Sequence, residues 1–183
     1  MKRKTFFTLL IIAFVLSFFV TPVGYWGKVW LMRFFASAPE IINVEDREVI
    51  DGYDWKLKDE NWEYFNLEQS KGKVLFIHFW ASWNTPSAAE LSGIQELYDT
   101  YADAVDFYIV TNEEREPVEE FMRKNKYTFP VTYRIVGADS PFKIPEIQGT
   151  YIIDKKGFIL VDSKETHDWN SSTVIELLDK LIN

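Results

Sequence analysis

Strand-like and helix-like hydrophobic spacing alternate along the chain from Glu40 onward. The near-continuous apolar run 74–80 has the length of a strand that is covered on both faces, so we expect it in the middle of a sheet. Apolar residues then recur at three- and four-residue steps from Thr85 to Tyr101, which predicts a helix packed on that sheet. This alternation is typical of parallel strands joined by helical crossovers.

Two further strands are expected at 105–110 and 129–135. The helix between them should contain Pro117 in its first turn and end near Asn125. Two short strand-like pieces precede the central run and are expected to extend the sheet or cover its edge: 54–57 and 64–67.

The C-terminal part of the chain predicts a hairpin followed by a helix. Segments 150–154 and 158–162 flank Lys155-Lys156-Gly157, a short connection of the kind found in β-hairpins. Ser171 or Ser172 can cap the last helix, because a serine oxygen accepts from the free N–H groups of a helix start.

The N-terminal segment has a different pattern. After Lys2-Arg3-Lys4 no charged side chain occurs until Lys28. As a helix, the uncharged stretch 5–27 would span about 35 Å at roughly 1.5 Å per residue, more than the ~30 Å of a bilayer core. We therefore expect residues 1–22 to form a cytoplasmic basic end and an uncleaved transmembrane anchor.

A cleavable signal peptide is the alternative for this segment, because Ala36-Ser37-Ala38 offers small residues at the required spacing. That site lies about 16 residues beyond the apolar run, and Pro39 would follow the cut. Both features favour the uncleaved anchor.

Aromatic and basic residues are interleaved in 23–39, which suits a linker at the headgroup region of a membrane. A plain linker is the alternative. Lys28 and Arg33 are about 140° apart on a helical wheel, so the segment has no clean amphipathic face. The basic N-terminus places the body, 40–183, on the extracytoplasmic side by the positive-inside tendency.

Charge and cysteine content exclude several functions. Residues 1–39 carry five basic and no acidic side chains, so the net charge of −8 leaves −13 on the body, which would repel nucleic acid. The chain contains no cysteine, which excludes disulfides, thiolate nucleophiles and cysteine-bound metal. His78 and His167 have no second ligand at metal-binding spacing, so we interpret both as packed or surface residues and expect no metal.

The segment 79–90, FWASWNTPSAAE, resembles the active-site segment of TlpA/ResA-like thioredoxin-fold proteins, Phe-Trp-Ala-Ser/Thr-Trp-Cys-x-Pro-Cys-x-x-Glu. The resemblance extends over roughly residues 51 to 182. It includes shorter matches at 72–74, 129–131, 152–157 and 168–171. It implies an α/β thioredoxin-like fold, in which helices flank a central mixed sheet. This domain would follow an N-terminal transmembrane helix.

The resemblance puts the two family cysteines at Asn84 and Ser87. An amide is not a nucleophile, and a hydroxyl neither ionises near neutral pH nor exchanges with a disulfide. Asn84 is instead a good N-cap, so we expect a retained helix start without its chemistry. The alternative is that Asn84, Thr85 or Ser87 holds an anionic ligand at the helix terminus in a ligand-binding or transferase-like site.

Relatives carry a cis-proline in the loop that faces the cysteines, and the resemblance aligns Gln148 with it. A cis bond before a non-proline residue costs about 3 kcal/mol, so the bond between Ile147 and Gln148 is expected to be trans. A register shift that makes Pro145 the cis-proline is the alternative. Glu90 matches an acidic residue that tunes the family cysteines, and without a thiol we assign it no role.

These features predict a redox-inactive, membrane-anchored module of the bacterial cell envelope, without cofactor or metal. It would sit as a single-pass protein in the inner (cytoplasmic) membrane with its domain on the periplasmic side. It would bind or support an envelope protein through a patch around Trp83, Asn84 and Ile147, although partial burial of Trp83 is the more ordinary expectation. By family name alone it would be a thiol-disulfide oxidoreductase. The candidate binding residues are Trp83, Asn84, Thr85, Ser87, Ile147 and Gln148.

Overall fold

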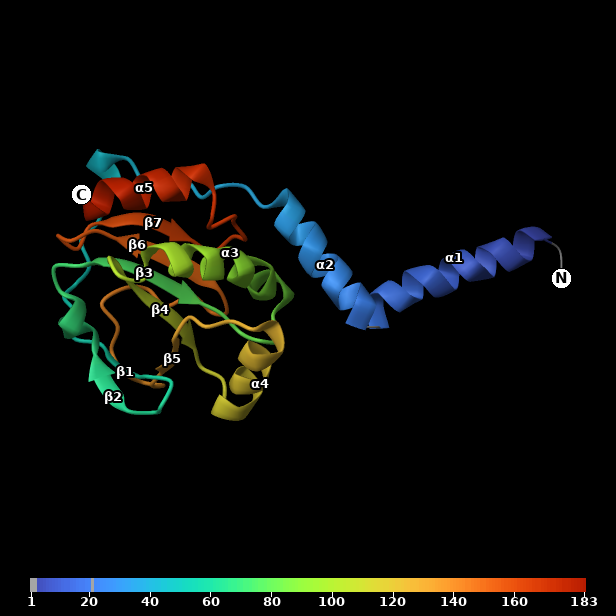
Figure 1. The fold of residues 1–183 in the computed structure, drawn as a ribbon, viewed down its shortest axis with the longest axis horizontal. Coiled ribbons are helices and arrows are strands. Elements are labelled where there is room, and N and C mark those ends of the chain that lie inside the picture. Colours follow the sequence, from blue (N-terminus) through green and yellow to red (C-terminus); the bar gives the residue numbers. More distant parts are fainter. Residues whose placement is uncertain (1–2, 21) are drawn as a thin grey trace.

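The computed structural model describes residues 3–20 and 22–183, so Met1, Lys2 and Thr21 of the expected anchor lie outside the described residues. The body contains one seven-stranded mixed sheet in the order β2-β1-β5-β4-β3-β6-β7 (Figure 1). The strands are β1 Lys56–Lys58, β2 Tyr64–Asn66, β3 Val74–Phe79, β4 Val105–Thr111, β5 Val131–Arg134, β6 Gly149–Ile153 and β7 Ile159–Ser163. The helices are α1 Arg3–Val20, α2 Pro22–Phe35, α3 Thr85–Tyr101, α4 Arg115–Asn125 and α5 Ser172–Ile182, with short 3-10 turns at Val44–Asp46 and Leu67–Ser70.

The expected thioredoxin-like order of elements is confirmed. β3 pairs in parallel with β4 and antiparallel with β6, and all six of its residues are buried. It lies one strand away from the centre, because the β1–β2 hairpin adds two strands at the β5 edge. The hairpin β6–β7 and the helix α3 have almost the expected bounds.

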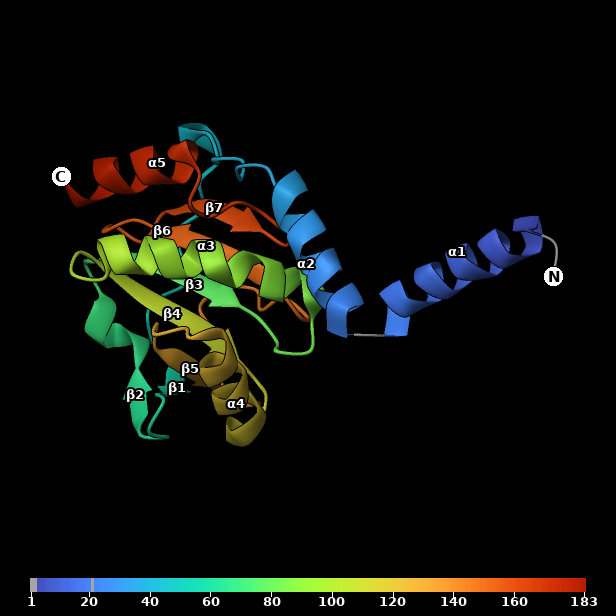
Figure 2. The same cartoon turned by 45° about the vertical axis from the view of Figure 1, so that its right-hand side comes forward.

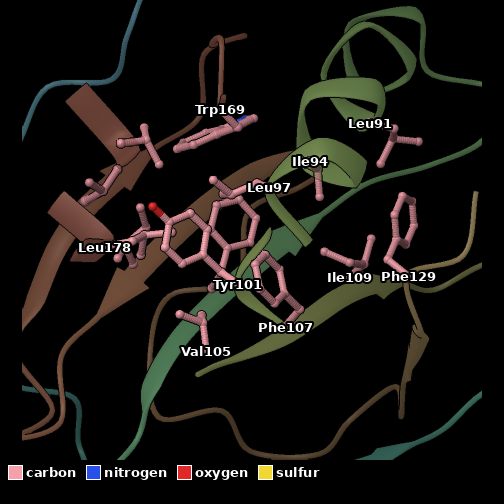
Figure 3. Close-up of a cluster of buried hydrophobic side chains, with 14 of the residues drawn as sticks. Leu91, Ile94, Leu97, Tyr101, Val105, Phe107, Ile109, Phe129, Trp169 and Leu178 are labelled. Atoms are coloured by element: carbon pink, nitrogen blue, oxygen red, sulfur yellow. The ribbon is translucent and has the colours of Figure 1, made fainter. Parts of the chain in front are cut away.

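Side chains of α3, α4 and α5 share one hydrophobic cluster with one face of the sheet. Leu91, Ile94, Leu97 and Tyr101 point from α3 toward β4, as Figure 3 shows. The opposite face is covered by residues outside these helices, among them Trp55, Leu67 and Phe142. This packing fixes α3, and with it the residues at the start of α3, against the sheet.

Residues 22–35 form a helix, α2, which the sequence had not predicted. Val29 is buried against Ala88 and Ala89 of α3, and Arg33 forms a 3.1 Å ion pair with Glu96. α2 runs along the body beside α3, whereas α1 projects away from it (Figure 2). Gly24 lies inside α2.

Beyond α2 the chain joins the body directly. Asp168 donates its backbone N–H to the carbonyl oxygen of Ser37 at 3.0 Å, and these segments form an isolated β-bridge. The predicted linker is therefore bound to the domain at both Val29 and Ser37.

Every residue described in α1 from Arg3 to Ser17 is exposed. Within 3–20 and 22–183, no helix reaches the combination of length and hydropathy needed to cross a membrane.

Candidate functional site

The start of α3 is held by Asn84. Its Oδ1 accepts the backbone N–H of Ser87 at 2.9 Å and the Ser87 hydroxyl at 2.8 Å. The carbonyl oxygen of Asn84 accepts the first helical N–H, that of Ala88, at 3.1 Å. This confirms the predicted N-cap, and it uses groups of the helix terminus that an anionic ligand would need.

Gln148 lies beside the helix start. The Ser87 hydroxyl is 3.4 Å from Oε1 of Gln148, whose Nε2 donates to the Lys164 carbonyl at 3.3 Å and to Thr166 Oγ1 at 3.4 Å. The described residues contain no cis peptide bond, so the trans bond before Gln148 is confirmed and a cis bond before Pro145 is wrong. A polar side chain thus fills the position that the resemblance gives to a cis-proline.

Trp83 is 64% exposed and Ile147 is 43% exposed. The loop before α3 is fixed at Ser82, whose N–H and hydroxyl donate to the Glu113 carboxylate at 2.6 and 2.7 Å. Trp80, in contrast, is buried and packs on Phe121. The expected partial burial of Trp83 is wrong, because the pinned loop leaves its ring outside the core.

The two exposed residues flank one connected set of contacts. Trp83 immediately precedes Asn84, Ile147 immediately precedes Gln148, and Ser87 contacts both Asn84 and Gln148. Thr85 is half-buried in the first turn of α3, and its side chain makes no hydrogen bond to the other described residues of this set. The structure therefore brings the candidate residues of the two loops together.

Glu90 has a structural role that its place in the sequence does not indicate. It is 2% exposed, and its Oε1 accepts from Trp169 Nε1 at 2.7 Å and from the His167 backbone N–H at 3.1 Å. Burial raises the pKa of Glu90 to about 8, against the opposing effect of these two hydrogen bonds. The carboxyl joins α3 to the loop before α5.

Both histidines are packed, as predicted. His78 is fully buried with Nδ1 2.8 Å from Thr150 Oγ1, and burial lowers its pKa to about 3. His167 Nε2 lies 2.7 Å from Ser163 Oγ. Among the described residues, no three His, Cys, Asp or Glu side chains gather as metal ligands do.

The chemistry available at this site is limited. The Ser87 hydroxyl contacts two amide oxygens, and an amide cannot remove its proton as a general base would. A hollow beside the site, lined by Trp80, Pro145 and Ile147 among others, has a volume of about 20 Å³. That is room for about one water molecule.

Two functional contacts were missed from the sequence. The bond from Ser82 to Glu113 joins residues 31 positions apart, and no local spacing indicates it. Glu90 looked like an ordinary acid in an early helical turn, although the family motif was a signal that this position is special.

Comparisons with known proteins agree with this geometry. Residues 51–161 match the AhpC/TSA family. The chain is 30% identical to the thioredoxin-like protein YneN of Bacillus subtilis over 142 residues, covering 75% of this chain and 80% of YneN. It is 31% identical to sporulation thiol-disulfide oxidoreductase A of B. subtilis over 96 residues, covering 49% of this chain and 58% of that protein.

A solved structure shares the fold. The crystal structure of a putative thiol:disulfide interchange protein DsbE from Chlorobium tepidum superposes with a TM-score of 0.63 at 17% identity, covering 75% of this chain and 99% of that one. With the family match over most of the body, these likenesses show that the chain belongs to the AhpC/TSA family of thioredoxin-like proteins, in a form without cysteine.

Proposed function

We propose that this protein is a redox-inactive thioredoxin-like module that binds another protein of the bacterial cell envelope. The observation that carries the proposal is the pair of exposed apolar residues, Trp83 and Ile147, on either side of a helix start that holds Asn84 and Ser87 in place of thiols. Large apolar side chains that are exposed beside a fixed polar network are typical of protein-binding surfaces.

The module is held at the membrane by its N-terminal helix. The exposed apolar side chains of α1, among them Phe6, Ile11 and Phe14, support this part of the proposal, because such a surface is unfavourable in water. Exposed aromatic residues continue on α2 with Trp30, Phe34 and Phe35. In this arrangement the basic N-terminus is cytoplasmic and the body lies on the periplasmic side of the inner membrane.

The rival functions have less support. A ligand-binding or transferase-like site at Asn84–Ser87 would need a pocket with convergent polar groups, whereas the adjacent hollow holds about one water molecule and Asn84 already satisfies Ser87. Thiol-disulfide exchange, which the names of relatives suggest, requires thiols that this chain does not have.

The binding face can be tested by site-specific photo-crosslinking in the native membrane. A photoreactive residue at Trp83 should give a discrete protein adduct that is lost when Ile147→Glu is added. The same residue at Val136, which is 78% exposed, is the matched control and should give none. Equal adducts from both positions, or none from Trp83, would contradict the proposed face.

A further inference from the structure

A groove separate from the helix start lies between the β1–β2 turn and α4. Its volume is about 320 Å³, at the lower end of the range for small-ligand sites, roughly 300–1,000 Å³. Its floor is apolar and aromatic, with Val118, Phe129, Val131 and Tyr133 all buried. This size suits one side chain better than a cofactor.

The charges at the groove are mainly negative. Glu60 and Glu119 line it together with one cation, Arg115, whose Nε pairs with Glu119. Glu60 has no ion-pair partner among the residues that the structure describes. Among the residues that line the groove, carboxylates therefore outnumber cations by one, and the neighbouring Lys58 is not one of these residues.

The pKa of the Tyr133 phenol is affected by the same charged residues. Burial raises its pKa to about 12, helped by Glu119, Glu113 and Glu60 and opposed by Arg115. The phenol is thus neutral at physiological pH. Its hydroxyl makes no hydrogen bond to another residue in 3–20 or 22–183, so it can accept one from a ligand.

The β1–β2 turn, which supplies Glu60 and Asn61 to the groove, also contains a residue with a strained backbone. Trp62 has φ 66°, in the left-handed region that a bulky residue rarely adopts. Its indole lies 5.8 Å from the ring of Tyr133, which lines the groove, so Trp62 supports the groove from behind that residue. The ammonium of Lys58 lies 4.4 Å from the Trp62 ring and 5.0 Å from the Tyr64 ring, so this hairpin already holds one cation over aromatic faces.

We propose that this groove binds a lysine side chain of a partner polypeptide, with the ammonium near Glu60 and the aliphatic stem on the aromatic floor. Charge complementarity supports a basic partner, because both the groove and the whole body are acidic. The stem of a lysine covers apolar surface while its head stays near water and carboxylates. The inference concerns a second binding face and does not depend on the proposed role of Trp83.

The test uses the full chain in mild detergent and two probes that differ by one charge. The tripeptide acetyl-Gly-Lys-Gly-amide is titrated against its Nε-acetyl-lysine analogue, with the amide NMR signals of Asn61 and Thr128 at the groove as the readout. We expect saturable shifts with the lysine peptide in the millimolar range, and binding about tenfold weaker with the acetylated peptide. The affinity should fall further as salt is added.

Variants separate the contribution of the charge from that of the aromatic packing behind Tyr133. Glu60→Gln should weaken binding about threefold, and Glu176→Gln, an exposed carboxylate on α5, is the matched control that should change nothing. Trp62→Gly accepts the left-handed backbone and removes the ring, so it should weaken binding while distant amide signals stay in place. Equal binding of the two peptides, equal effects of the two glutamate variants, or no shift at Asn61 and Thr128 up to about 10 mM peptide would overturn the proposal.

Discussion

Ser87 donates both its backbone N–H and its hydroxyl to the same atom, Oδ1 of Asn84, at 2.9 and 2.8 Å. At the two positions where the family has a pair of thiols, this chain has the N-cap residue of α3 and the residue that the N-cap side chain binds. A cap of this kind stabilises the fold and offers no nucleophile, because its hydrogen bonds end on an amide.

The first prediction concerns the stability that this cap provides. Asn84→Ala should lower the free energy of unfolding by about 1 kcal/mol, a fall in Tm of about 3 °C, since two donors lose their acceptor. Asn84→Asp should retain the cap. Thermal unfolding followed by circular dichroism measures both, with the exposed Asn112→Ala as the control. No difference between Asn84→Ala and Asn112→Ala would show that the cap is not stabilising.

The second prediction concerns pH and the buried Glu90. Its pKa is about 8 in the folded protein and near 4.5 when unfolded, so the folded state holds the proton more tightly. The resulting stability is complete below the unfolded pKa and is lost as the pH rises toward 8. His78, with its pKa lowered to about 3, acts in the opposite direction between about pH 6.5 and 3.

Thermal unfolding between about pH 7 and 9 isolates the contribution of Glu90, because His78 is neutral there in both states. The native protein should lose stability across this range. Glu90→Gln should have a flatter profile, since its amide oxygen can still accept from Trp169 and it does not ionise. Parallel profiles for the two proteins would mean that Glu90 does not titrate in this range.

The third prediction concerns the attachment of α2. Val29→Asp places a charge against Ala88 and Ala89, so α2 should detach and its amides should exchange hydrogen at least about tenfold faster. Leu31→Asp adds the same charge at a residue that is 46% exposed and should leave the exchange of α2 near native. The Arg33–Glu96 pair is half-exposed at both ends and should contribute little. Hydrogen exchange with mass spectrometry measures both variants, and equal exchange for Val29→Asp and Leu31→Asp would contradict this contact.

Much of the fold could be predicted because the body follows local rules. The stripe from Thr85 to Tyr101, the buried run of β3 and the Asn84 cap are each visible in neighbouring residues. α2 was missed because Lys28 and Arg33 do not share a face and its packing depends on small residues of α3, distant in sequence. A helix of this kind is specified by tertiary contact more than by its own pattern.

The site was predictable in position and less so in detail. The motif located Asn84, Ser87 and Gln148, and the trans bond before Gln148 followed from the cost of a cis bond. The exposure of Trp83 depended on the Ser82 contact with Glu113, which sequence spacing does not indicate. The groove at Tyr133 was missed because its lining comes from three segments that are separate in the sequence: 60–61, 115–122 and 127–133.

The most direct test of the central claim, a preserved thioredoxin-like helix start without its chemistry, is the rate of insulin disulfide reduction by the full chain and by Asn84→Cys/Ser87→Cys/Gln148→Pro. We expect that the native protein adds nothing to the rate of reductant alone, and that the triple variant is active because α3 still offers its N-terminus to a thiolate. Turnover by the native protein, or silence of a folded triple variant, would contradict it.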